Sequence, residues 1–260
     1  MFRVGKLVYA LCAAVRVDSV ILVILACGLL PTLAVRGAAD GGATPVLVEL
    51  FTSEGCSSCP AADRLLERLD REQPFAGAQI VVMSEHVDYW NHDGWVDRYS
   101  SSTFTLRQRD YQVRLKLPDV FTPQIVVDGV RQCIGNNEAE VVNLIRKAAA
   151  TPKVDVQIRG LDGAGKFQIE VNGGEGRGDV YVAFADEESQ SDVSGGENRG
   201  RKLHHVAIVR KLRKAGKLDA KGNFLGEVSA GLPGPGRLIA FVQEPRTGAV
   251  AGVGLYRIPG

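Results

Sequence analysis

The spacing of hydrophobic residues changes at about residue 150. Before that point, short apolar runs typical of buried strands alternate with segments whose apolar residues recur every three to four positions, as in amphipathic helices. The predicted order is strand 46–51, helix 61–69, strand 79–84, helix 97–115, a hairpin around residues 125–134, and helix 138–150. A helix between the first two strands makes them parallel neighbours. The pattern therefore predicts an α/β domain over residues 45–150.

From residue 153 onward, apolar residues alternate strictly with polar ones, which is typical of strands with one buried face. The predicted strands are 154–158, 167–171, 180–184, 203–209, 238–242 and 250–256. Glycine-rich turns separate them, and no helical period is present. We expect residues 153–260 to form an all-β, sandwich-like domain.

Residues 1–39 have the pattern of an export signal. Basic residues precede an uncharged, mostly apolar stretch at 19–35, and small residues follow it. The apolar run is shorter than the roughly 20 residues of a spanning helix and contains Pro31, yet an uncleaved membrane anchor stays open as an alternative. A lipoprotein modified at Cys27 is a third. All three interpretations place the folded part outside the cytoplasm, in the periplasm or the medium, where disulfides persist.

Composition excludes two classes of protein. With 45% hydrophobic and 23% charged residues, the chain is too apolar to be wholly disordered. Its 31 basic and 30 acidic residues nearly balance, so no strong positive field exists to hold nucleic acid. We therefore expect a globular protein with no nucleic-acid partner.

Two of the five cysteines form a Cys-Ser-Ser-Cys motif at residues 56–59, between the first predicted strand and the first predicted helix. Unpaired N–H groups at a helix N-terminus stabilise a thiolate, so this position favours Cys56 as a nucleophile. Cys59, three residues later, is within reach to attack a mixed disulfide formed at Cys56. The motif indicates thiol–disulfide chemistry, while an inert disulfide and half of a metal site stay open as alternatives.

These residues resemble the thioredoxin superfamily over residues 45–150, because the cysteine pair is followed far downstream by Thr122-Pro123 ahead of the hairpin. The resemblance implies that Pro123 is cis and faces the cysteines, and that the Thr122 backbone pairs with a substrate chain. The stretches 48–60 and 86–90 and the β-rich tail are more closely similar to a secreted bacterial thioredoxin-like family known only as a domain of unknown function. The expected fold class is thus an α/β thioredoxin-like domain followed by an all-β sandwich-like domain.

The motif also departs from thioredoxin itself. Gly55 stands where thioredoxin has tryptophan, and Ser57-Ser58 replaces its Gly-Pro pair. These differences argue against a general reductase of the cytoplasmic type. Thr122, the residue before the proline, resembles the residue at this position in periplasmic isomerase-type relatives of thioredoxin.

His86 follows the second predicted strand. In a parallel sheet the carboxyl end of this strand lies beside the turn that carries Cys56 and Cys59, which we call the cysteine turn. A histidinium there would lower the pKa of a thiol, and a neutral imidazole would move protons during exchange. The alternative is a hydrogen-bond network that fixes the loop, with Tyr89, Trp90 and Trp95 packed beneath it. Glu54, beside the cysteine pair, is expected to be solvated.

The remaining cysteine and histidine residues carry weaker signals. Cys133 lies on a predicted strand and is expected to be a small buried apolar residue, with a third exchanging thiol as the alternative. A structural zinc site needs four ligands, but His204 and His205 are adjacent and would point to opposite faces of a strand.

The leading hypothesis is an exported thiol–disulfide oxidoreductase that acts on protein thiols or disulfides and needs no cofactor. In it, Cys56 is the nucleophile, Cys59 resolves, Thr122 and Pro123 position the substrate chain, and His86 tunes the thiol. One alternative is a protein that binds a soft metal such as copper(I) through both cysteines, with His86 as a third ligand. The other is a catalytically silent protein that binds a partner through the basic residues of its β-rich segment. The sequence identifies no particular substrate, redox partner or redox direction.

Overall fold

The structure is a computed structural model that describes residues 42–161, 165–174, 177–229 and 234–259. The predicted export signal or membrane anchor at residues 1–39 lies outside these ranges. Within them, no helix is long and apolar enough to cross a membrane.

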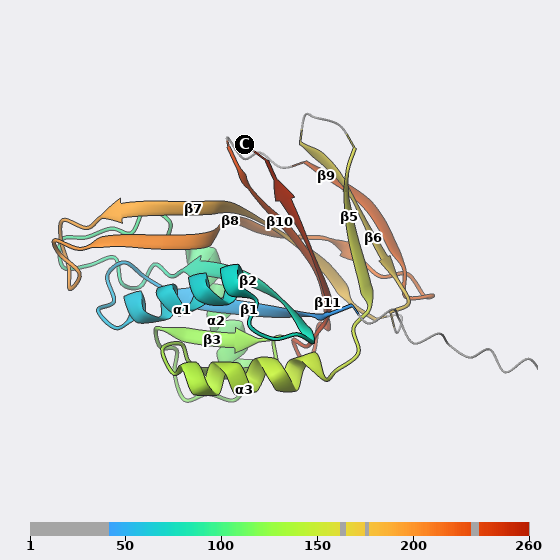
Figure 1. Ribbon diagram of the computed structural model, residues 1–260, viewed down its shortest axis with the longest axis horizontal. Coiled ribbons are helices and arrows are strands. Elements are labelled where there is room, and N and C mark those ends of the chain that lie inside the picture. The colour runs from blue at the N-terminus through green and yellow to red at the C-terminus, as the bar shows by residue number, and fades with distance from the viewer. Residues whose placement is uncertain (1–41, 162–164, 175–176, 230–233, 260) are drawn as a thin grey trace, which may run out of the picture. The chain divides into compact units, whose positions relative to one another are not determined.

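The helices lie between the first four strands or directly after them, and seven further strands follow (Figure 1). The first group is β1 (Thr44–Thr52), α1 (Cys59–Glu72), β2 (Ala78–His86), α2 (Ser102–Arg114), β3 (Gln124–Val127), β4 (Arg131–Ile134) and α3 (Glu138–Ala149). The second group is β5 (Asp155–Gly160), β6 (Lys166–Asn172), β7 (Asp179–Asp192), β8 (Lys202–Lys217), β9 (Phe224–Ser229), β10 (Gly236–Gln243) and β11 (Val250–Ile258).

Strands β1 to β4 form one half of a mixed eight-stranded sheet in the order β11-β10-β7-β8-β2-β1-β3-β4. β1 and β2 run parallel with α1 between them in the chain, and β3 and β4 form an antiparallel hairpin, so both predictions are confirmed. Asp128 and Gly129 turn the hairpin, each with a positive φ. β3 also runs antiparallel to β1, and Phe51 pairs with Gln124. The C-terminal end of β1 therefore lies beside the segment that leads into β3.

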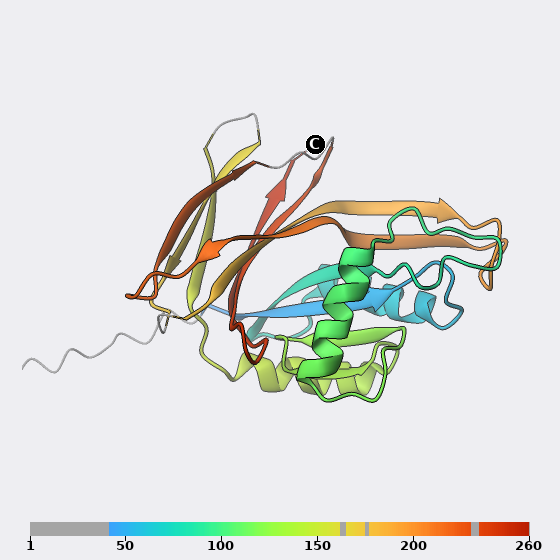
Figure 2. The same cartoon turned by 180° about the vertical axis from the view of Figure 1, so that it is seen from behind.

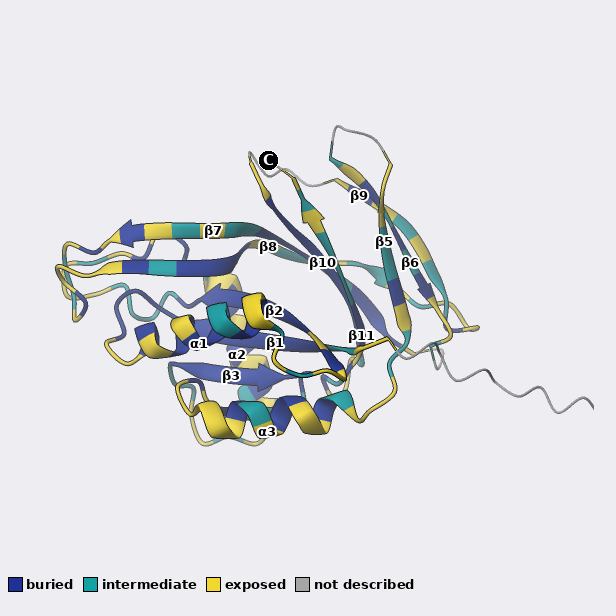
Figure 3. Ribbon diagram, viewed as in Figure 1, coloured by how far each residue is buried: buried dark blue, intermediate teal, exposed yellow. Residues whose placement is uncertain are grey.

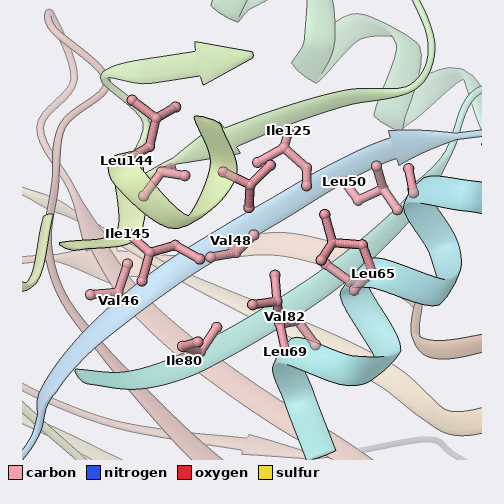
Figure 4. Packing of buried hydrophobic residues seen from close by; sticks show 14 of the residues in the cluster. Val46, Val48, Leu50, Leu65, Leu69, Ile80, Val82, Ile125, Leu144 and Ile145 are labelled. Atoms are coloured by element: carbon pink, nitrogen blue, oxygen red, sulfur yellow. The ribbon is translucent and has the colours of Figure 1, made fainter. Parts of the chain in front are cut away.

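The helices cover opposite faces of this half of the sheet. α1 and α3 lie on one face (Figure 1), and the view from behind shows α2 on the other (Figure 2). Val46, Val48 and Leu50 of β1 pack with residues of α1 and α3 (Figure 4). Leu47 belongs instead to the core that includes Phe104 of α2. Because both faces are covered, β1 is buried along most of its length (Figure 3), which explains why residues 46–51 are apolar except for Glu49.

The strands after α3 extend the same sheet and add a smaller one. β8 pairs antiparallel with β7 and joins β2 through the parallel pair Ser84 and Ile208. β5, β6 and β9 form a three-stranded sheet that shares a hydrophobic core with β7 and β10. The predicted boundary at 150–153 falls between α3 and β5, but strands from both sides of it share the large sheet, and Gly41–Gly260 is one compact unit.

Several elements differ from the pattern-based prediction. α2 begins at Ser102 instead of residue 97, because the side chain of Ser101 accepts a hydrogen bond of 3.2 Å from Thr103 N and caps the helix there. β9 was not predicted, since Leu225 is exposed while Gly226 occupies the following position, which disturbs the alternation of apolar and polar residues.

β7 and β8 are also longer than predicted, at 14 and 16 residues. The sequence after Phe184 is mostly polar, so the apolar pattern ends before the strand does. This polar extension carries the β7–β8 turn to the end of the sheet where β1 stops and α1 begins (Figure 1).

Candidate functional site

Cys56 and Cys59 form a disulfide at the start of α1, with Cα atoms 5.4 Å apart. β1 ends at Thr52, and a short turn leads to Cys59, the first residue of the helix. Cys56 is 1% exposed and Cys59 0%, although Ser57 and Ser58 between them are exposed. The pair therefore lies at the predicted strand-to-helix turn with both cysteines buried.

The Thr122–Pro123 peptide bond is cis, as the resemblance implies. Trp90 Nε1 donates a 2.7 Å hydrogen bond to Thr122 Oγ1. The backbone of Trp90 also lies against Gly55, where a Cβ would be 2.9 Å from Trp90 O. At Gly135 a Cβ would lie 3.1 Å from Pro123 Cβ and 3.2 Å from a side chain in the first turns of α1. The proline loop thus packs close to the start of α1, and Trp90 connects it to the cysteine turn.

A buried charged cluster flanks the disulfide. Glu54 precedes it by two residues, and Asp63 follows it by one helical turn. His205 of β8 lies between them, with Nε2 3.5 Å from Glu54 Oε1 and Nδ1 3.8 Å from Asp63 Oδ2. Trp95 Nε1 donates to Glu54 Oε2 at 3.0 Å. The prediction of a solvated Glu54 is wrong, because these polar partners from other elements allow the carboxylate to be buried completely.

His86 is buried at the end of β2, beside the same cluster. Its Nδ1 lies 2.7 Å from Asp97 Oδ2, and its ring contacts those of His205 and Tyr99, with centroids 4.7 Å and 5.3 Å away. Asp97 Oδ2 also accepts a 2.9 Å bond from Glu54 N. The hydrogen-bond network that was the alternative for His86 is therefore present, and its link to the cysteine turn runs through Asp97. An effect of His86 on the thiol stays a prediction.

The cluster shifts the pKa of two of its members. Burial disfavours the ionised form of Asp97, but His86 and the N–H groups of Glu54 and Tyr99 outweigh it and lower the pKa of Asp97 to about 2. Burial also disfavours the imidazolium of His205, but Asp63 and Glu54 outweigh it and raise the pKa of His205 to about 10. His205 is therefore charged at neutral pH and compensates the buried carboxylates.

Replacing His205 by glutamine is expected to lower the free energy of unfolding by about 2 kcal/mol at pH 6, because buried carboxylates lose their cation. An imidazole with a pKa of 6.5 when unfolded and about 10 when folded contributes its full stability below pH 6.5 and loses it as the pH rises through 10. We expect urea unfolding of the oxidised proteins to give the largest difference between parent and variant below pH 6.5 and a vanishing one above pH 10.

His204→Gln is the matched control for that series. His204 is the neighbouring residue on the opposite face of β8 and its side chain is 29% exposed, so its loss should cost less than about 1 kcal/mol. A His205→Gln difference that stays constant from pH 6 to pH 10 would contradict the charged state assigned to His205.

Cys133 on β4 is a free cysteine buried in the core beneath α3. Burial, together with the nearby Glu140, raises the pKa of its thiol to about 12, so it stays protonated at neutral pH. The prediction of a small buried apolar residue is confirmed.

The two adjacent histidines point to opposite faces of β8, as their spacing predicts. His205 enters the buried cluster, while His204 lies between Glu67 and Glu188 at 3.4 Å from each. Among the residues that the structure describes, no three His, Cys, Asp or Glu side chains are arranged to hold a metal ion.

The turn of the β7–β8 hairpin, residues 193–201, brings residues to the cysteines that the sequence did not predict; we call it the hairpin tip. Asn198 is fully buried and donates from Nδ2 to the carbonyl oxygens of Glu54 and Cys56, at 2.8 and 2.9 Å. Glu197 Oε2 accepts a 2.9 Å bond from Ser57 N, 140 residues earlier in the chain. Their contact with the cysteines has no local signal, because only the length of the hairpin places them there.

The chain matches a protein-family model and is similar to a solved structure. Residues 47–243 match the family described as "Protein of unknown function (DUF1223)". The chain is similar to the crystal structure of protein AGR_C_4864 from Agrobacterium tumefaciens, with 26% identity and a TM-score of 0.68, over 85% of this chain and 96% of that one. Among curated proteins, none matches significantly. Because the family match spans most of the chain, this protein belongs to the DUF1223 family.

Proposed function

We propose that this protein is an exported thiol–disulfide oxidoreductase whose Cys56–Cys59 pair exchanges with protein thiols or disulfides. The observation that carries the proposal is a disulfide at the start of α1 beside a loop with a cis Thr122–Pro123 bond. A disulfide that only stabilises a fold requires neither a helix N-terminus nor such a loop. Export is proposed from the pattern of residues 1–39.

A thioredoxin-like architecture for residues 45–150 is part of the proposal. The parallel β1-α1-β2 unit, the β3–β4 hairpin and α3 support it, with neighbouring strands in the order β2-β1-β3-β4. In this arrangement the cysteines and the cis proline come from the adjacent ends of β1 and β3.

The exchange reaction conserves electrons and protons through a mixed disulfide. A substrate thiolate attacks Cys56 Sγ, the bond to Cys59 breaks, and Cys59 leaves as a thiolate that takes up a proton. A second substrate thiol, after losing its proton, attacks the mixed disulfide, releases Cys56 and leaves the substrate oxidised. Two electrons pass from the substrate dithiol to the cysteine pair, and the reverse sequence reduces a substrate disulfide.

Residues of this chain would assist at defined steps. N–H groups at the start of α1 stabilise the Cys56 thiolate. The Thr122 backbone positions the substrate chain next to Cys56. His86 acts indirectly, through Asp97 and the backbone of Glu54.

The reduction potential of the Cys56–Cys59 pair tests the proposal. The protein lacking residues 1–39 is equilibrated in glutathione buffers of graded potential, quenched, alkylated and weighed by mass spectrometry, with Cys133→Ser to remove the third thiol. We expect a value within the roughly −120 to −270 mV range of working oxidoreductases. A value below about −300 mV marks a structural disulfide, would overturn the proposal and favour the catalytically silent alternative.

A further inference from the structure

The closed disulfide is shielded from other thiols. An attacking thiolate must reach a sulfur of the disulfide, so the exchange rate depends on access to it. Cys56 and Cys59 are 1% and 0% exposed, whereas Ser57 and Ser58 are exposed. A neighbouring segment must therefore move before exchange begins.

The hairpin tip contacts the backbone of the cysteine turn directly. Asn198 Nδ2 binds the carbonyl oxygens on both sides of Gly55, those of Glu54 and Cys56. Glu197 Oε2 binds the N–H of Ser57, the residue between the cysteines. Trp90 packs on Gly55 as well, so the turn is held by the tip and by the loop after β2.

The backbone of the tip fits closely against that loop. Gly196 N donates to Asp93 O at 3.1 Å, and a Cβ on Gly195 would lie 2.4 Å from Gly94 O. A Cβ on Gly196 would lie 4.0 Å from the Cα of Gly55. These contacts are mostly made by backbone atoms and glycines, and the large side chain that Gly196 approaches is Trp95, where a Cβ would lie 3.3 Å from Trp95 Cβ. A contact built mainly from polar backbone groups can separate at low cost.

Reduction of the disulfide changes the charge at this contact. The Ser57 N–H that Glu197 binds in the oxidised protein lies next to Cys56 in the chain, before α1 begins at Cys59. Backbone N–H groups beside a cysteine stabilise its thiolate. A Cys56 thiolate and the Glu197 carboxylate then carry the same charge close to the Ser57 N–H and repel each other. Reduction therefore weakens the contact between the tip and the cysteine turn.

We propose that the hairpin tip, residues 193–201, is a gate that covers the Cys56–Cys59 disulfide when it is oxidised and is released when it is reduced. Glu197 and Asn198 are the residues that hold it closed. The gate limits the rate at which a thiol reaches the disulfide and ties the exposure of the site to its redox state. This inference rests on the exchange function proposed above, because only a disulfide that is cycled needs a gate.

The rate of reduction by glutathione measures the gate without a protein substrate. The oxidised full-length protein and its variants are mixed with excess reduced glutathione, quenched with acid at intervals, alkylated and weighed. Glu197→Ala loses one hydrogen bond to the cysteine turn and Asn198→Ala loses two. We therefore expect both variants to be reduced roughly tenfold faster than the parent. Arg199→Ala, an exposed position on the same tip, is the matched control and should react at the parental rate.

Asn198 is buried, so Asn198→Ala could fail to fold, whereas Glu197 is exposed and Glu197→Ala is expected to keep the fold. Thermal unfolding of both variants checks this expectation. Equal rates for the parent, Glu197→Ala and Arg199→Ala would overturn the gate. Hydrogen exchange tests the redox link: the amides of Ser57 and of residues 193–201 should exchange faster in the reduced protein. Equal exchange in both states would overturn release on reduction.

The gate and the proposed function fail in different ways. Faster glutathione reduction in the variants combined with a potential below about −300 mV would show that the tip shields the disulfide, but would overturn the oxidoreductase and with it the redox role of the gate. A potential in the working range with unchanged variant rates would support the oxidoreductase and overturn the gate.

Discussion

Replacing Cys56 by serine is expected to reduce thiol–disulfide exchange by the purified protein to the level of the buffer alone. Cys56 lies in the turn that leads into α1, and in the proposed reaction every mixed disulfide with substrate forms on its sulfur. A serine hydroxyl forms no disulfide, so the first step has no acceptor. The measurement is the rate at which a protein with a scrambled or reduced disulfide is converted, with glutathione as the redox buffer.

Cys59→Ser gives the complementary result. The first step proceeds from reduced Cys56, but no thiol resolves the mixed disulfide, so covalent complexes with substrate should accumulate and be visible without a reducing agent. Cys133→Ser is the matched control and should keep the parental rate, because Cys133 is buried in the core away from the exchange chemistry. Parental exchange by Cys56→Ser, or loss of exchange in Cys133→Ser alone, would contradict the assigned roles.

Replacing Arg237 by alanine is expected to lower the free energy of unfolding by about 3–5 kcal/mol, a large share of the typical 5–15 kcal/mol of a globular protein. The Arg237 side chain is 2% exposed and binds both carboxylate oxygens of Asp70, each at 2.8 Å. It also binds Glu187 of β7. Its loss leaves a buried Asp70 carboxylate with little compensation. Urea unfolding of the oxidised protein at pH 7 measures the effect.

This network matters for the site because it ties α1 to the C-terminal strands. Asp70 belongs to the helix that carries Cys59, whereas Arg237 and Glu187 belong to β10 and β7. Arg257→Ala is the matched control: Arg257 contacts the same two carboxylates, but its side chain is 48% exposed, so its loss should cost at most about 1 kcal/mol. Equal losses for the two arginine variants would show that burial is not what gives Arg237 its effect.

The local elements around the cysteines could be predicted because their signals are short-range. The apolar run of β1, the helical spacing of Leu65, Leu66 and Leu69, and the Asp128-Gly129 turn each express a backbone preference within a few residues. β9 and the outer half of the β7–β8 hairpin lack such a period. Their strands are held by pairing with neighbours instead, which no local pattern records.

The sequence by itself therefore determined the strand-helix order of residues 45–150, the cysteine pair at the start of α1, and the burial of Cys133. Only the tertiary structure decided that strands after residue 150 join the same sheet, that Glu54 is buried against His205, and that Asn198 and Glu197 reach the cysteine turn. The physical reason is range: helix periodicity and turn geometry act between near neighbours, whereas burial of a charge depends on partners supplied from far along the chain.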